Sequence, residues 1–493
     1  MKLTGLLFAA ALLGSCTQPA AEENYTRHVD PKIGTGGHGH VFVGANVPFG
    51  LVQVGPTSIP QTWDWCSGYH ASDSTVIGFS HTHLSGTGIG DLFDVTVMPV
   101  TGEVTYARGT EDDPTSGLWS YADRTQEIAR PGYYSVPLTR YGIRAELTAT
   151  ARVGLHRYTF PASDAAAVVF DLENGGCWDK ATETHLAKEG DRTVTGWRHS
   201  TGWAKDQRVY FVAEFSKPFE KFETIGDNYA RASFRTTDGE QVSLKVALSP
   251  VSVEGAKANL AAELSGWDFD ATAKAADKAW NDELSKVKIE TADETARRIF
   301  YTALYHTMIA PSLFCDVNGD YYGSDHAIHR NADFTNYTTF SLWDTYRAAM
   351  PLMTVLHPEK MPDIVQTMLH ISDEQGRLPV WHLWGNETDC MVGNPGIVAV
   401  ADAIVKGIGG FDREKAFEAI RKTAMNPDRG NGLRMEYGYI PCEMFNEAVA
   451  YDMEYALADG AAARAAETLG KAEDAKYFAG QGGGCEVFRG AQP

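Results

Sequence analysis

The sequence predicts an α+β multidomain protein in which an N-terminal β-sandwich is followed by an incomplete (α/α)6 toroid, a ring of helical hairpins. Three observations lead to this prediction. Short runs that alternate apolar and polar residues fill residues 25–265, and apolar residues recur with a helical period after residue 291. The helical part is also too short to close a ring of six hairpins.

The β-sandwich domain is predicted over residues 25–265. Runs such as GIRAELTATARVGLHRYTF, AAAVVFDLEN, QRVYFVAEFS and QVSLKVALSPVSVE alternate in polarity and are bounded by Gly, Asp, Asn or Pro. A period of two is typical of strands with one buried face. Many short strands with no helical segment between them favour two packed sheets.

A helical linker is predicted over residues 266–290 and a partial helical domain over residues 291–493. ETARRIFYTALYHTMIAPSLF and the periodic segments after it predict six or seven helices. A closed ring needs twelve, which at about 12 residues each plus connections is well over 300 residues. The aperiodic ending GQGGGCEVFRGAQP can be a flexible tail. We expect instead a chain that is cut short, or read out of frame, inside this domain.

Residues 1–24 are typical of a bacterial lipoprotein signal peptide and tether. MKLTGLLFAAALLGSC combines a positive residue, Lys2, with an apolar run too short to span a membrane as a mature helix. Leu13-Gly14-Ser15-Cys16 matches a lipobox, in which Cys16 becomes the lipidated N-terminus. An ordinary signal peptide with a chance cysteine is the alternative. We expect an outer-membrane lipoprotein in the periplasm or at the cell surface, held only by the lipid on Cys16.

The charge balance excludes one class of partner. The chain of 493 residues has 43 basic and 64 acidic residues, and a formal charge of −21. Such a chain repels phosphate backbones, so nucleic acid is not an expected partner. The 11 Trp, 21 Tyr and 22 Phe residues, beside loops rich in Asn, Asp, His and Gly, favour a sugar-binding protein.

The stretch GFSHTHLSGTG, residues 78–88, raises three possibilities. His81 and His83 are one residue apart, so on a strand both rings point to one side and could hold zinc or copper. No third ligand follows in a tight pattern. The alternatives are a packed network of imidazoles, hydroxyls and backbone groups, and a set of sugar contacts.

Three further stretches combine aromatic and polar residues. TWDWCSGYH places Trp63, Trp65 and Tyr69 close to Asp64 and His70, so these rings can face a cleft and stack on a sugar ring. SLWDTYR places Asp344 and Arg347 three residues apart on a helix, either as a simple ion pair or as a carboxylate held to accept sugar hydroxyls. WHLWGNETDC lies in a loop between helices, where the cleft of a helical ring forms.

Together these segments resemble glycoside hydrolase family 92, the exported bacterial exo-α-mannosidases. The resemblance is carried, in order, by YTRHVDPKIGTGGHGHVFVGANVPFGLVQVGPT, WDWCSGYHASDSTVIGFSHTHLSGTG, GWAKDQRVYFVAEFSKPF, FSLWDTYRAAMPL, LPVWHLWGNETDCMVG and YGYIPCEMFNEAVA. It implies a β-sandwich packed on an (α/α)6 barrel. It also implies calcium-dependent hydrolysis of terminal α-mannosyl residues of mannans or N-glycans, with inversion of configuration.

The resemblance also implies site residues. The expected substrate contacts are Trp65, Gly68, Tyr69, His70, His81, His83, Asp344, Arg347, Trp381, Glu387 and Thr388. The acid and base carboxyl groups of an inverting enzyme are expected in barrel segments beyond residue 493, and the calcium ligands are not assigned. A non-catalytic surface lipoprotein that binds mannan is therefore the main alternative. A phosphorylase with a similar barrel is another, although nothing in the sequence suggests a phosphate cradle.

Overall fold

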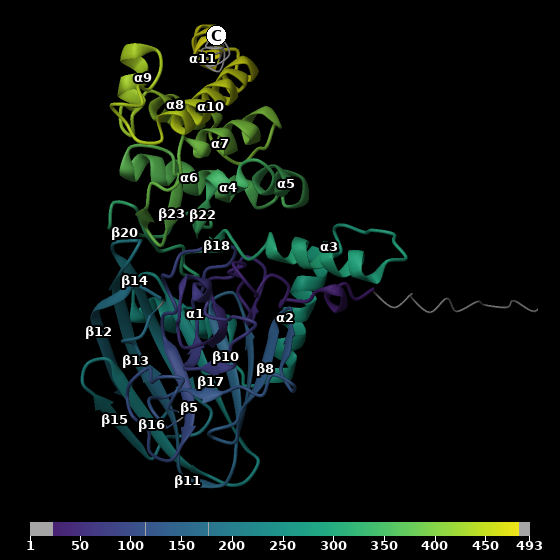
Figure 1. The fold of residues 1–493 in the computed structure, drawn as a ribbon, viewed down its shortest axis with the longest axis vertical. Coiled ribbons are helices and arrows are strands. Elements are labelled where there is room, and N and C mark those ends of the chain that lie inside the picture. The colour runs from purple at the N-terminus through teal and green to yellow at the C-terminus, as the bar shows by residue number, and fades with distance from the viewer. Residues whose placement is uncertain (1–22, 114, 176, 483–493) are drawn as a thin grey trace, which may run out of the picture.

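The computed structural model describes residues 23–113, 115–175 and 177–482. The predicted lipobox with Cys16 lies outside these ranges. Within them, no helix has the length and apolar character needed to cross a bilayer. A β-sandwich is followed by a helical domain, which confirms the predicted fold class, and Figure 1 shows the helices α4–α11 stacked at one end of the sandwich.

Two antiparallel sheets form the sandwich, and their inner faces share one large apolar core. The first sheet has the order β1 (Ala45–Asn46), β2 (Gln53–Thr57), β4 (Gly78–Ser80), β5 (Thr96–Thr101), β11 (Ser163–Asp171), β16 (Tyr229–Thr236), β15 (Lys221–Ile225). The second has the order β12 (Lys180–Glu189), β13 (Thr193–Thr201), β14 (Gln207–Phe215), β17 (Glu240–Ser249), β10 (Val153–Phe160), β9 (Ile143–Ala149), β8 (Tyr133–Leu138), β7 (Ile128–Arg130). The short strands β3 (Thr75–Val76) and β6 (Ser120–Tyr121) pair separately.

Two helices cover the outer face of the second sheet. They are α1 (Val253–Glu263) and α2 (Phe269–Leu284), and their apolar side chains pack on Val153 and Leu155 of β10. This cover explains why β10 is buried on both faces at its start. The strand expected to run through residue 254 ends at Ser249, because Ser252 caps α1 by accepting a hydrogen bond from the backbone of Gly255.

The helical domain begins with α3 (Glu294–His306), whose cap Asp293 accepts two backbone N–H groups. The later helices are α4 (Leu342–Thr345), α5 (Ala349–Leu356), α6 (Met361–Gln375), α7 (Pro395–Val405), α8 (Arg413–Ala424), α9 (Asn431–Tyr437), α10 (Ala448–Thr468) and α11 (Ala472–Gly482). The described residues thus hold nine helices from α3 onward, more than the six or seven expected, because α4, α5 and α9 are too short to show a period.

Short strands join the two domains. β22 (Phe340–Ser341), β23 (Trp381–Leu383) and β24 (Asn386–Glu387) form a small sheet at the junction. The Asn386 amide donates to the Asp206 carbonyl at 2.8 Å and its oxygen accepts the Asp206 N–H at 3.0 Å, while Trp203 meets Trp381 edge to face at 4.8 Å. These contacts fix the loop after β13 against β23.

A chain of neutral hydrogen bonds crosses the sandwich core. His81 Nδ1 faces the Val95 carbonyl at 2.6 Å, so Nδ1 carries the proton and Nε2 accepts. His156 Nε2, 2.9 Å away, must then donate to His81, and His156 Nδ1 accepts from the Tyr158 hydroxyl at 2.7 Å. Burial lowers the pKa of His81 to about 4 and that of His156 well below its usual value, so both rings stay neutral.

Replacing Tyr158 by phenylalanine should lower the free energy of unfolding by about 1–3 kcal/mol, because His156 Nδ1 is left buried without a donor. Tyr210→Phe is the matched control, since its half-buried hydroxyl bonds His199 Nε2 at 3.2 Å near solvent and should cost less than about 1 kcal/mol. Urea denaturation measures both losses, and equal losses would contradict the hydrogen-bond chain.

The same histidines should make the fold sensitive to acid. Unfolded His81 titrates near 6.5 and folded His81 near 4, so the unfolded state binds more protons in that window and stability falls as the pH falls. One such group removes about 2 kcal/mol between pH 7 and pH 5. Between pH 7 and pH 5, the free energy of unfolding should therefore fall by about 2 kcal/mol more in the wild type than in His81→Asn. Parallel losses would show that His81 does not titrate this way.

Candidate functional site

A small cavity lies where the sandwich meets the helical domain. Its volume is about 150 Å³. The sandwich contributes the segment 85–87, directly after the His81–His83 stretch, and the helical domain contributes the rest. The lining residues are Ser85, Gly86, Thr87, His306, Thr307, Ala310, Pro311, Thr339, Phe340, Ser341, Asp344, Thr345, Ala349, Met350, Met353 and Trp381.

Two of the predicted contact residues line this cavity. Asp344 lies in the first turn of α4, where its carboxylate is exposed and accepts a hydrogen bond from the Ser341 hydroxyl. The helix N-terminus favours its negative charge. Trp381 on β23 is buried and also belongs to the helical domain, so both predicted contacts reach the cavity from that domain. Asp344 is the one carboxylate among the described lining residues.

His306, at the end of α3, also lines the cavity and was missed by sequence reasoning. Its Nε2 atom is buried and has no hydrogen-bond partner, and burial lowers the pKa of the ring to about 4. The ring is therefore neutral at pH 7, and Nε2 can donate or accept one hydrogen bond with a ligand. The sequence LYHTM gave no sign that His306 faces a cavity, because the helical period of this segment predicts that the position packs in the core.

Arg347 does not pair with Asp344. Its guanidinium forms an ion pair with Glu454 of α10 and lies over the rings of Trp343 and Tyr346, 4.7 and 4.5 Å from their centroids. The prediction that Arg347 holds the Asp344 carboxylate is therefore wrong in this geometry. Arg347 instead ties the turn after α4 to α10.

Glu387 and Thr388 position Trp381. The Glu387 carboxylate accepts the backbone N–H groups of Val380 at 2.8 Å and of Trp381 at 2.9 Å, and the Thr388 hydroxyl donates to the Trp381 carbonyl at 2.8 Å. Both residues fix the backbone on either side of the indole, and neither is among the residues lining the cavity.

His81 and His83 lie in the sandwich interior. Both are almost fully buried, and His83 Nδ1 faces the Gln53 carbonyl at 2.7 Å. Neither is among the metal-ligand groups of the described residues or among the residues lining the cavity. The packed network, one of the three alternatives for this stretch, is what the geometry shows.

Of the two tryptophans in TWDWCSGYH, the expected substrate contact Trp65 is the buried one. Trp65 is 9% exposed, donates through Nε1 to Asp73 at 2.7 Å and stacks on His70 at 4.4 Å. Gly68 has φ +83° and packs by His83, and the Tyr69 hydroxyl donates to Glu127 at 3.0 Å. None of these four lines the cavity. Trp63 is instead 49% exposed, because the 3-10 helix Trp63–Trp65 turns alternate indoles outward and inward.

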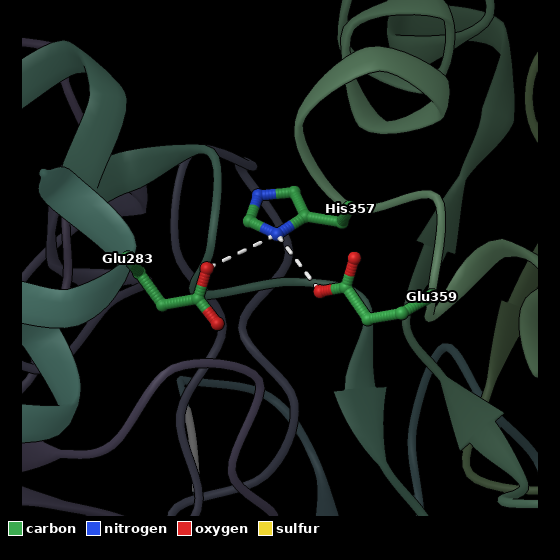
Figure 2. Close-up of side chains that lie close together, drawn as sticks. All are labelled: Glu283, His357 and Glu359. Carbon is green, nitrogen blue, oxygen red and sulfur yellow. Dashed lines mark ion pairs between the residues drawn. The ribbon is translucent and has the colours of Figure 1, made fainter. Parts of the chain in front are cut away.

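Two groups of described residues have the geometry of metal ligands. The first, Glu283, His357 and Glu359, surrounds the ammonium group of Lys286. Figure 2 shows Glu283 and Glu359 approaching His357 Nδ1, at 3.2 and 3.9 Å. Lys286 Nζ lies 2.7 Å from Glu283, 3.1 Å from His357 and 3.2 Å from Glu359. The lysine thus occupies the place of a cation.

The second group is Asp325, His329 and Glu374. Glu374 is already engaged by the Tyr321 hydroxyl at 2.8 Å and the Ser324 N–H at 2.7 Å. Asp325 Oδ1 likewise accepts the Ala327 N–H at 3.0 Å and lies 3.1 Å from His329 Nε2. Calcium takes about six to eight oxygen ligands, whereas this group offers an imidazole and two carboxylates that are already hydrogen-bonded. Neither group lines the cavity, and neither of the two fits the calcium ion implied by the resemblance.

Comparisons with known proteins agree on one family. The model of the glycosyl hydrolase family 92 N-terminal domain matches residues 28–249, and that of the family's catalytic domain matches residues 255–485. A curated relative, an uncharacterized secreted glycosidase of Arthroderma benhamiae, is 25% identical over 99% of this chain and 65% of its own length.

Solved structures show the same likeness. A family GH92 α-mannosidase from Bacteroides thetaiotaomicron, in complex with mannoimidazole, is 38% identical with a TM-score of 0.90 and is matched over 94% of this chain and 64% of its own. A GH92 inverting mannosidase from strain VPI-5482 of that species is 28% identical with a TM-score of 0.84, over 95% of this chain and 65% of its own. The chain thus spans 64–65% of the length of these relatives.

The two family models together match the sandwich and the helical domain of this chain. The fold agrees with solved members of the same family along nearly the whole chain. The chain belongs to glycosyl hydrolase family 92.

Proposed function

We propose that the cavity between the two domains holds the terminal mannosyl unit of an α-mannoside, within the framework of an inverting α-mannosidase. The observation that carries the proposal is the pairing of Asp344 and Trp381 across one small cavity at the domain junction. Solved family members are α-mannosidases, one of them in complex with mannoimidazole and another an inverting enzyme. Mannans and N-glycans are the substrates we expect.

The size and chemistry of the cavity suit one sugar unit. Pockets for drug-sized ligands are usually about 300–1,000 Å³, and this cavity of about 150 Å³ is smaller. The Trp381 ring offers an apolar surface for the C–H face of a pyranose. The Asp344 carboxylate can accept sugar hydroxyl groups, and the Thr87 hydroxyl and the neutral His306 ring can each donate or accept one hydrogen bond.

Hydrolysis with inversion needs more than this cavity provides. One carboxyl group must protonate the leaving oxygen while another activates water on the opposite face of the sugar, about 6.5–9.5 Å away. Asp344 is the single carboxylate among the described lining residues, so acid and base roles cannot both be filled from them. The two candidate ligand groups lie outside the cavity and do not fit calcium, so the proposed sugar contacts involve protein side chains only.

The single carboxylate among the described lining residues favours a second candidate function, the binding of mannan without turnover. The cavity, the indole and the carboxylate needed for recognition are all present in the described residues. One relative is a secreted glycosidase, and we extend this to an exported location for the chain. Anchoring of that exported protein through lipid on Cys16 stays a prediction.

Replacing Asp344 by asparagine should weaken the binding of methyl α-mannoside about tenfold or more, because a hydrogen bond to a charged group contributes about 1.5–3 kcal/mol. Isothermal titration calorimetry measures the affinity. Asp373→Asn is the control, since Asp373 is an exposed carboxylate on α6 that pairs with Lys415 away from the cavity. Unchanged affinity in Asp344→Asn would place the sugar elsewhere.

Hydrolysis of an aryl α-mannoside by this chain should not rise above the buffer rate, because one carboxylate cannot act as both acid and base. Release of the aryl group and of mannose is followed with time, with and without added calcium. Robust release, abolished by a chelator, would show that the chain carries a complete catalytic set and would contradict the binding-only function.

A further inference from the structure

We propose a second glycan-binding region beside the cavity, made of the exposed indoles of Trp63 and Trp178 and the polar hollow next to Trp178. This region, the two-indole surface, would bind inner sugar units of an α-linked mannooligosaccharide whose terminal unit occupies the cavity. The inference rests on the proposed function, and it adds a preference for longer chains that the cavity alone does not give.

The segment after the cavity forms the floor of the two-indole surface. Thr87 lines the cavity, and Gly88 and Gly90 follow it directly. A Cβ atom on Gly88 would lie 2.4 Å from the Trp63 ring, and one on Gly90 would lie 2.9 Å from the Trp178 ring. Each indole therefore lies against a glycine, and both glycines follow Thr87, a cavity-lining residue, within a few residues along the chain. Any larger residue at either position would displace an indole.

Both indoles are held in place by hydrogen bonds. Trp63 Nε1 donates to the Gly88 carbonyl at 2.8 Å. Trp178 bonds through its side chain to the carboxylate of Asp91, which is fully buried. The side chains of Cys66 and Cys177, the neighbours of the two indole segments, interact directly and link them. The rings are thus fixed while remaining 49% and 41% exposed.

The hollow beside Trp178 has a volume of about 700 Å³, more than four times that of the cavity. Its lining is predominantly polar and includes Glu173, Asn174, Lys180, Glu183, Thr184 and Asn228. An exposed indole in such a setting offers a flat apolar face next to many hydrogen-bonding groups, which matches the C–H faces and hydroxyls of a sugar. Carboxylates on the wall disfavour an anionic ligand.

The test compares the binding of methyl α-mannoside with that of a linear α-mannotetraose by titration calorimetry, using the full chain. The wild type should bind the tetraose at least about tenfold more tightly than the monosaccharide. Trp178→Ala should lose most of this gain, because the tetraose loses its stacking partner, and Trp178→Phe should keep part of it. Circular dichroism and melting temperature establish that each variant is folded.

Trp267→Ala is the matched control, since the half-buried Trp267 ring lies 3.9 Å from Lys245 on the outer face of the second sheet and should leave both affinities unchanged. Equal wild-type affinities for the two sugars, or a length gain that survives Trp178→Ala, would overturn the two-indole surface. If Asp344→Asn weakens methyl α-mannoside binding about tenfold or more in that case, the cavity proposal stands alone. A wild type that binds neither sugar would overturn both.

Discussion

The buried carboxylate of Asp91 is the interaction on which the geometry around the cavity depends. It is fully buried, and burial raises its pKa. It accepts the backbone N–H groups of Trp203 at 3.0 Å and Ala204 at 2.9 Å and the Gln207 amide at 2.8 Å. Such a group is costly to bury unless its hydrogen bonds are made, so the loop after β13 can adopt few other positions.

That loop connects the sandwich to the helical domain. Trp203, held by Asp91, packs against Trp381, and Trp381 is held from the other side by Glu387 and Thr388. The position of Trp381 in the cavity wall is therefore set by residues that do not themselves line the cavity. Two predicted sugar contacts, Glu387 and Thr388, belong to this supporting group.

The sequence predicted the layers of this protein better than its site. Alternation in residues such as 153–160 and the helical period of 294–306 depend on local sequence, and both elements form where expected. Which of two indoles in TWDW faces solvent depends on a 3-10 turn and on the glycine at position 88, which no period encodes. Helix spacing predicted that Arg347 pairs with Asp344, three residues away. Arg347 instead pairs with Glu454, which is 107 residues away in the sequence.

The account rests on a terminal sugar lying between the segment 85–87 of the sandwich and the first turn of α4. A crystal structure of this chain soaked with mannoimidazole tests it most directly. The account predicts ligand density in the cavity, with a ring hydroxyl within hydrogen-bond distance of Asp344 and the ring against Trp381. Well-ordered ligand bound elsewhere, with the cavity filled only by water, would contradict it.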